Sequence, residues 1–211
     1  MQKIKNTILY EPRPLFHHAA RHSIESHGCS LTCIHPGGLS EEVITLRTDN
    51  ALFATGLSGA GDELFSLLRI IHSLTAENVE LTVWIPAGDA LLVQLMYGLG
   101  VQTLLCESYL QEELPQRIRN PAFSSPHLPQ WCPPDGISQN KVRLTDRELD
   151  TLIDCARGLN PYEIASLRHA SYKTIYVHRS NVRRRLNLGN SVQWLDLLAR
   201  LTQFRTLHSI R

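Results

Sequence analysis

The sequence predicts two domains of different fold class: an α/β domain with a parallel five-stranded sheet, then an all-α domain of four helices. Three observations support this prediction. Short apolar runs alternate with helical ones through residues 1–119. Five of the eleven prolines fall in residues 120–141. Helix-capping residues then recur through residues 142–211, and a chain of 211 residues is long enough for two small domains.

The first domain is predicted to contain five strands interleaved with five helices. Such an order implies a parallel sheet covered by helices on both faces. The expected strands are 7–10, 30–35, 51–55, 81–86 and 102–106. The expected helices lie near 13–27, 39–46, 62–74, 89–98 and 108–119.

Residues 120–141 are predicted to form a proline-rich linker between the domains. Proline removes a backbone donor and opposes both helix interiors and sheets, so the segment should be semi-extended. Trp131 is expected to pin part of this linker to a domain surface.

The second domain has a start signal for each helix. Thr145 and Glu148 form a capping box, and Gly158 is placed to end the first helix. Asn160 and Pro161 begin the second, Ser171 caps the third, and the fourth starts near Ser191. The first helix has an apolar stripe of Leu149, Leu152, Ile153 and Ala156. The expected buried face of the second is Ile164, Ala165 and Leu167, and the fourth has Val192, Leu195, Leu198 and Leu201 in line.

The formal net charge of +1 hides a division between the two halves. Residues 141–211 hold 13 basic and 6 acidic side chains, a balance of +7, whereas the rest of the chain balances to −6. This asymmetry indicates that the second half meets a polyanion.

The third helix has one apolar face and one polar, basic face. Ile175, Val182 and Leu186 recur at helical spacing, while Tyr176, Val177, Ser180 and Arg184 share another face. Cations flank that second face: Lys173, Arg179, Arg183 and Arg185. A short helix and a tight turn precede it, which is typical of a helix-turn-helix. A merely solvated helix, with arginines kept for solubility, is the alternative.

Residues 144–188 resemble the LuxR/NarL-type helix-turn-helix of bacterial transcription regulators. The matching residues are Leu144, Thr145, Arg147, Glu148, Leu152, Gly158, Glu163, Ile164, Ala165, Leu167, Ser171, Thr174, His178, Val182 and Leu186. Two positions depart from the family pattern: Ala170 stands where a larger aliphatic residue is usual, and Ser180 where lysine is frequent.

The resemblance implies roles for individual residues. Lys173, Thr174 and His178 are expected at the DNA backbone, and Tyr176, Val177 and Ser180 at base edges. The cations Arg179, Arg183, Arg184 and Arg185 complete the expected DNA-binding set. The fourth helix is expected to form a dimer contact through Val192, Leu195 and Leu198.

The first domain resembles, at the level of its strand–helix pattern, the receiver domain of response regulators, which has a flavodoxin-like fold. Receivers accept phosphate on an aspartate and bind Mg²⁺ through acidic residues. This chain keeps Glu11, followed by Pro12, after the first strand. The remaining positions carry Gly56 for the acceptor, Ala87 for the hydroxyl and Cys106 for the lysine. We therefore expect a degenerate receiver that is not phosphorylated.

Degenerate receivers of this kind resemble those of auxiliary Rcs-type regulators, which pair with a full response regulator. The resemblance leaves open a homodimer or a heterodimer with another response regulator, with residues 96–114 as the expected association surface. Two other functions also remain open: an antagonist that sequesters a response regulator, and a ligand-sensing LuxR-type regulator with a signal pocket.

Several other classes are disfavoured by the sequence. No apolar run reaches the roughly 18 residues of a membrane helix, and the amino terminus does not resemble a signal peptide, so we expect a cytoplasmic protein. The five cysteines are scattered, as expected of reduced thiols. His18 and His22 stand four residues apart without a completing set of metal ligands, and residues 56–61 lack the lysine of a P-loop. No catalytic constellation, metal or cofactor is expected.

Overall fold

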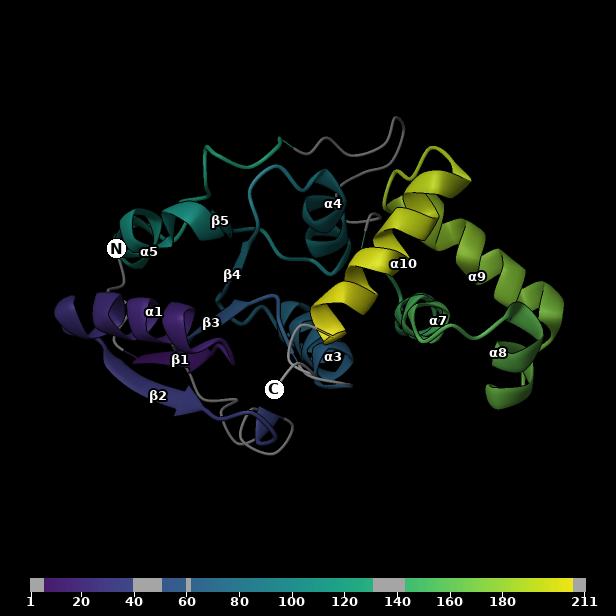
Figure 1. The fold of residues 1–211 in the computed structure, drawn as a ribbon, viewed down its shortest axis with the longest axis horizontal. Helices are drawn as coiled ribbons and strands as arrows, with labels where there is room; N and C mark the ends of the chain where they lie inside the picture. The colour runs from purple at the N-terminus through teal and green to yellow at the C-terminus, as the bar shows by residue number, and fades with distance from the viewer. Residues whose placement is uncertain (1–5, 40–50, 60–61, 131–142, 207–211) are drawn as a thin grey trace.

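The computed structural model describes residues 6–39, 51–59, 62–130 and 143–206 (Figure 1). Within these residues the first domain contains a parallel sheet of five strands in the order β2-β1-β3-β4-β5. The strands are β1 (Asn6–Tyr10), β2 (Ser30–Ile34), β3 (Ala51–Gly56), β4 (Leu81–Ile85) and β5 (Leu104–Cys106). The predicted fold class and all five strands are confirmed, with small shifts at their ends.

Helices cover both faces of this sheet (Figure 1). They are α1 (Pro14–Ser26), α3 (Glu63–Ala76), α4 (Ala90–Gly98) and α5 (Leu110–Arg119), with a 3₁₀ turn η1 (Glu107–Tyr109) before α5. Helices α1 and α5 lie on one face, and α3 and α4 on the other. The helix expected near 39–46 lies outside the described residues, apart from Leu39.

Alternate residues of each strand enter different cores, because successive side chains point to opposite faces of a sheet. Leu9, Ala54 and Trp84 pack with α1 and α5. Tyr10, Phe53, Val83 and Ile85 belong to the other core, which includes residues of α3 and α4. Each central strand is therefore buried on both faces, as is usual for parallel sheets.

The second domain consists of α7 (Asp146–Ala156), α8 (Pro161–Leu167), α9 (Tyr172–Arg185) and α10 (Ser191–Thr206). The predicted caps are present. Thr145 forms its capping box with Glu148, and Asn160 forms a second one with Glu163. The Ser171 hydroxyl accepts from the Thr174 backbone amide. Gly158 follows α7 with a φ of +90°, a left-handed conformation that favours glycine.

One expectation about buried residues in this domain was wrong. Leu167 at the end of α8 is 56% exposed. In α10 the buried stripe is Trp194, Leu197 and Leu201, whereas Val192 and Leu195 face solvent. The spacing of apolar residues in α10 fits two adjacent stripes, and the tryptophan belongs to the inner one.

The described part of the linker is attached to the first domain and is not freely extended. The Leu104 amide donates to the Ser124 hydroxyl, the Ser125 amide donates to the Leu104 carbonyl, and Leu128 is buried. Trp131 lies outside the described residues. The first half of the proline-rich segment is therefore an extension of the α/β domain.

The two domains pack against each other through α3 and α4 on one side and α7 and α10 on the other (Figure 1). The Leu144 amide donates to the Gly98 carbonyl at 2.8 Å, and Leu186 lies over Gly98. Apolar residues of both domains form one continuous core cluster. No described helix combines the length and apolar character that crossing a bilayer requires.

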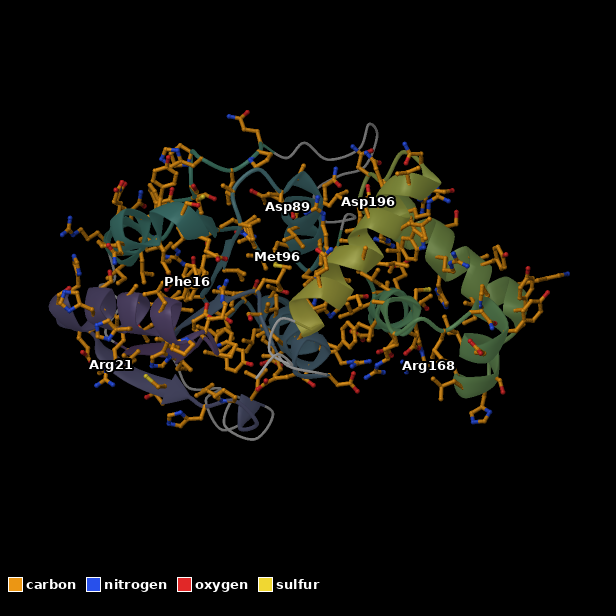
Figure 2. The ribbon with its side chains drawn as sticks, in the orientation of Figure 1. Phe16, Arg21, Asp89, Met96, Arg168 and Asp196 are labelled. Atoms are coloured by element: carbon orange, nitrogen blue, oxygen red, sulfur yellow. The ribbon has the colours of Figure 1, made fainter. Side chains whose placement is uncertain are left out.

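Ion pairs surround this apolar contact. Arg69 of α3 pairs with Asp150 of α7 at 2.8 Å, and Asp62 pairs with Arg157 at 3.3 Å. Asp89, labelled at the start of α4 in Figure 2, pairs with Arg200 of α10. Basic residues of the second domain thus meet acidic residues of the first at two of these three pairs.

Candidate nucleic-acid interface

Helix α9 presents one exposed polar face, as the spacing of its residues predicts. Ile175, Val182 and Leu186 are buried against the rest of the domain. The exposed face consists of Tyr176, Val177, Ser180 and Arg184. We call these four residues the exposed α9 face; they run along α9, whose amino-terminal end, next to α8, lies far from the first domain (Figure 1).

The residues expected at the DNA backbone lie at the amino-terminal half of α9. Lys173 and Thr174 are exposed, and His178 is partly exposed. The Thr174 hydroxyl lies 2.8 Å from the Ser171 hydroxyl, so Thr174 also takes part in the cap. The first turn of α9 additionally offers free amide groups and the positive end of its dipole, both of which favour phosphate.

The two central arginines of the expected set are partly buried. The Arg179 guanidinium lies 5.7 Å from the ring centres of both Tyr176 and Trp194. Arg183 is partly exposed, and its Nε is buried without a hydrogen-bond partner. Contacts with rings hold Arg179 against the helix while leaving its charge near the exposed α9 face.

Arg185 differs from the other cations expected at DNA. Its Nε lies 3.0 Å from a Glu148 carboxylate oxygen, and its Nη1 donates to the Arg143 carbonyl at 2.9 Å. Both partners lie at the start of α7, on the side that faces the first domain. The structure thus assigns Arg185 to holding α9 against α7, and we leave it out of the proposed DNA contacts.

A salt-bridge cluster fixes the turn between α8 and α9. Arg168, labelled near α8 in Figure 2, pairs with Asp154 at 2.8 Å and with Asp150 at 3.1 Å. The hydrogen bond with Asp154 raises the pKa of Arg168 above its ordinary value. Asp154 is fully buried, so this arginine compensates a carboxylate that would otherwise be costly inside the domain.

The residues expected to form a dimer contact lie on the outer side of α10. Val192 and Leu195 are 63% and 62% exposed. Leu198 is partly buried and packs against the chain's own core, so it offers less surface. A pair of exposed aliphatic side chains one turn apart is available for a partner.

At the carboxyl end of the sheet, the expected phosphorylation site is filled by an arginine. Arg13 lies 2.8 Å from the Glu11 carboxylate and 2.7 Å from the Glu107 carboxylate. Trp84 Nε1 donates to Glu11 at 2.8 Å. A Cβ built on Gly56 falls closer than 3.0 Å to Glu11, Trp84 and Arg13. Glycine is therefore the residue that fits this strand end.

The other two positions of the expected degenerate site carry no phosphate-binding chemistry. Ala87 is exposed in the turn after β4. Cys106 is buried, and its backbone amide donates to the carboxylate of Glu113 at 2.7 Å. The described residues contain no group of three or more His, Cys, Asp or Glu side chains suited to hold a metal ion.

Sequence reasoning missed three features of these sites. It overlooked Arg13, although a basic residue two positions after Glu11 was a usable signal. It did not predict that Glu113, within the expected association surface 96–114, is only 2% exposed. It also overlooked Tyr162 and Tyr172, which stack beside Tyr176.

Comparison with known proteins supports a helix-turn-helix in the second domain. Residues 142–198 match the family described as bacterial regulatory proteins, luxR family, and they form a LuxR-type helix-turn-helix. The nitrate/nitrite response regulator NarP of Escherichia coli K12 is 45% identical over 49 residues. That match covers 23% of this chain and 23% of NarP, so it extends over less than a quarter of either protein.

Two solved structures resemble the whole chain in fold. One is RcsB from Salmonella enterica serovar Typhimurium bound to the promoter rprA in the presence of the phosphomimetic BeF₃⁻. Its TM-score is 0.56 at 17% identity, covering 93% of this chain and 99% of that one. The other, two RcsB dimers bound to two parallel DNAs, has a TM-score of 0.54 at 18% identity, covering 92% and 98%. The chain therefore shares the two-domain fold, a receiver-like α/β domain followed by a helix-turn-helix, with these proteins.

Proposed function

We propose that this chain is a DNA-binding transcription regulator of the bacterial cytoplasm whose receiver-like domain works without phosphorylation. The observation that carries the proposal is the exposed α9 face, which is flanked by cations and is left uncovered by the rest of the described chain. The LuxR-type helix-turn-helix and the fold shared with promoter-bound RcsB support the same function.

DNA binding would place α9 in the major groove. In a helix-turn-helix, cations and the helix amino terminus bind phosphates, while shorter side chains contact base edges. Lys173, Thr174 and His178 would contact the backbone, with Arg179, Arg183 and Arg184 adding charge. Tyr176, Val177 and Ser180 would read sequence.

The absence of an acceptor aspartate supports control by some means other than phosphate. Arg13 already occupies the strand end beside Glu11 and Glu107 with its own positive charge. Concentration or a partner would then set activity, since a binding event shifts an equilibrium only by its differential affinity for the two states. Val192 and Leu195 of α10 are the surface we propose for a second copy of the chain or for another response regulator.

A selection experiment tests the proposed function. The full chain is incubated with a randomised pool of duplex DNA, bound duplexes are recovered and amplified, and binding is then measured by mobility shift. We expect convergence on a preferred sequence, bound far more tightly than its scrambled version. If no sequence is enriched while the protein remains folded, the proposed DNA-binding function is wrong. The better interpretation is then an antagonist that sequesters a response regulator through protein–protein contact.

A second measurement tests the claim about phosphate. The protein is incubated with acetyl phosphate and Mg²⁺, or with beryllofluoride and Mg²⁺, and examined by intact mass and by mobility shift. We expect no added phosphate and no change in DNA affinity. A phosphorylated aspartate, for instance Asp62, would return the chain to the ordinary response regulators.

A further inference from the structure

Three tyrosines form one continuous aromatic surface across α8 and α9. The rings of Tyr162 and Tyr172 are stacked, with centres 4.4 Å apart and planes 17° from parallel. The ring of Tyr176 lies 4.6 Å from that of Tyr172 at 58°. Tyr162 comes from the first turn of α8, whereas the other two come from α9. We call these three residues the tyrosine stack.

Burial in the domain core does not account for the two ends of this stack. Tyr162 is 68% exposed and Tyr176 is 48% exposed, whereas Tyr172 between them is partly buried. Tyrosine combines a large apolar ring with a polar tip, which suits it to surfaces that are covered when a partner binds. The exposed rings therefore point to a contact that lies outside this chain.

The charges around the stack favour an anionic partner. Arg179 lies 5.7 Å from the centre of the Tyr176 ring, and Lys173 is exposed one residue after Tyr172. Val177 and Ser180 of the exposed α9 face continue the same surface. Rings bordered by cations, on the surface already assigned to DNA, fit a duplex better than an apolar peptide groove.

The geometry also fixes the orientation of Tyr176. A ring packed against Tyr172, which is itself packed against Tyr162, has fewer rotamers than a ring standing free on a helix. The proximity of the Tyr176 side chain is also the leading cause of the raised pKa of Tyr172. A side chain ordered before binding loses less entropy when it contacts its target.

We propose that Tyr162 and Tyr172 are positioning residues for base reading by Tyr176, and that the Tyr162 hydroxyl contacts a phosphate of the flanking DNA backbone. This inference rests on the proposed function and deepens it. Tyrosine hydroxyls are regular phosphate donors in protein–DNA complexes. Sequence preference in this chain then depends on a residue of α8 as well as on the helix that enters the groove.

Substitutions at Tyr162 separate its two roles. Tyr162→Phe keeps the ring and removes the hydroxyl, so affinity for the selected duplex and for its scrambled version should fall alike, by about two- to tenfold. Tyr162→Ala also removes the stacking, so the ratio between the two affinities should fall by a further two- to tenfold or so. Tyr109→Ala is the matched control: Tyr109 is an exposed tyrosine of the first domain, stacked on His127, and its loss should change neither quantity.

A double-mutant cycle shows whether Tyr162 acts through Tyr176. In a Tyr176→Ala background, Tyr162→Ala should no longer lower the selected-to-scrambled ratio, because the ring that it positions is absent. Circular dichroism and thermal melting confirm that each variant is folded. The inference is overturned if Tyr162→Ala leaves the ratio unchanged in the wild-type background, or if its effect persists undiminished without Tyr176. A wild-type chain that enriches no sequence overturns the proposed function itself, so the two failures are distinguishable.

Discussion

Gly56 and Arg13 show how single residues shape the carboxyl end of the sheet. The Arg13 guanidinium bridges Glu11 and Glu107, and Trp84 of β4 donates to Glu11 at the end of β1. One guanidinium thus contacts both carboxylates. The Arg13 guanidinium also lies only 2.6 Å from the position that a Cβ on Gly56 would occupy.

We therefore expect that restoring an aspartate does not restore a receiver. Gly56→Asp should lower the free energy of unfolding by about 1–3 kcal/mol, because the new side chain overpacks the space beside Arg13 and Trp84. The variant should still take no phosphate from acetyl phosphate with Mg²⁺. Urea unfolding and intact mass measure the two effects; Gly189→Asp, where an added Cβ meets only an ordinary contact at 3.6 Å, is the control for loss of a glycine without overpacking. Stoichiometric phosphorylation of Gly56→Asp would mean that Arg13 moves aside readily.

Arg184 and Arg185 are neighbours in sequence but have different environments in the structure. Arg184 is exposed, whereas Arg185 pairs with Glu148. Each phosphate contact contributes about one unit to the slope of log affinity against log salt concentration. We expect Arg184→Ala to flatten that slope by roughly one unit. Titrations of a random duplex at several salt concentrations measure it.

Arg185→Met is the matched comparison for this prediction. It removes the ion pair at the base of α9 and leaves Glu148 partly unpaired, so thermal stability should fall. The salt slope should remain that of the wild type. If Arg185→Met flattens the slope as much as Arg184→Ala does, Arg185 contacts DNA and leaves Glu148 on binding.

At the scale of elements, a buried carboxylate joins α5 to β5 and to the start of the linker. Glu113 accepts hydrogen bonds from the Cys106 amide and from the Ser125 hydroxyl. Glu112, one residue earlier, is exposed. The two acids within the expected association surface therefore have different roles: Glu113 is structural, and Glu112 is available to a partner.

Substituting these two acids should give different results. Glu113→Ala should lower the free energy of unfolding by about 1–3 kcal/mol, because it leaves a buried amide and hydroxyl unpaired. Glu112→Lys should leave stability within about 0.5 kcal/mol of wild type. Chemical unfolding checks both, and sedimentation of Glu112→Lys then shows whether α5 takes part in association. Equal stability of the two variants would contradict the hydrogen bonds assigned to Glu113.

The elements that sequence predicted well are those specified by local chemistry. The five strands, Thr145, Asn160 and Ser171 caps and the stop at Gly158 depend on residues within a few positions of one another. Helix α10 was harder to predict because its apolar residues occupy more than half of its circumference. Only packing against α3, α4 and α7 selects Trp194, Leu197 and Leu201 as its inner stripe.

The features that sequence did not predict depend on residues distant along the chain. Arg13 meets Glu107, Arg69 meets Asp150, and Tyr162 meets Tyr172 only after the chain has folded. The strand-end site was predicted as a set of missing groups; Arg13 stands two positions after Glu11, but its pairing with the distant Glu107 could not be inferred from spacing. Local patterns indicated the surface that we propose for DNA, and tertiary contacts determine which of its side chains are exposed.

At the scale of the whole molecule, the domain interface leaves both proposed binding surfaces uncovered. Leu186, at the end of α9, packs over Gly98, while Tyr176 and Val177 remain exposed. Val192 and Leu195 of α10 are exposed in the same arrangement. The proposed DNA-binding and association residues are therefore exposed without any separation of the domains.

Gly98 is the position at which this arrangement can be tested. A Cβ there falls closer than 3.0 Å to the Leu186 side chain, so Gly98→Leu should separate the domains. We expect a larger radius of gyration by small-angle X-ray scattering and lower thermal stability. Affinity for the selected duplex should stay within about threefold, because the exposed α9 face does not depend on the interface. A large gain in affinity would mean that the docked arrangement restrains DNA binding.

His72 makes the same interface sensitive to pH. Its Nε2 lies 2.8 Å from the Leu144 carbonyl of the second domain, and its Nδ1 lies 3.3 Å from Asp146. Burial is the main cause of its lowered pKa; the charge of Arg143 lowers it further, while the Leu144 carbonyl and Asp146 oppose the shift. Arg69 and Asp150 line the same interdomain pocket. The neutral ring is therefore the form that the folded chain prefers.

The sign of the pH effect follows from this lowered pKa. Below the ordinary histidine pKa of about 6.5, the unfolded chain binds a proton that the folded chain does not, so stability rises with pH in that range. The contribution of His72 should be complete above about pH 7 and should diminish as pH falls below about 6.5 toward the folded-state pKa. Urea unfolding at pH 7.5 and 5.5 measures this loss, and His72→Gln should reduce it because glutamine does not titrate. His18→Gln, which replaces an exposed histidine of α1, is the matched control substitution. If His72→Gln shows the same difference between the two pH values as the wild type, the pH dependence comes from other groups and His72 is not its source.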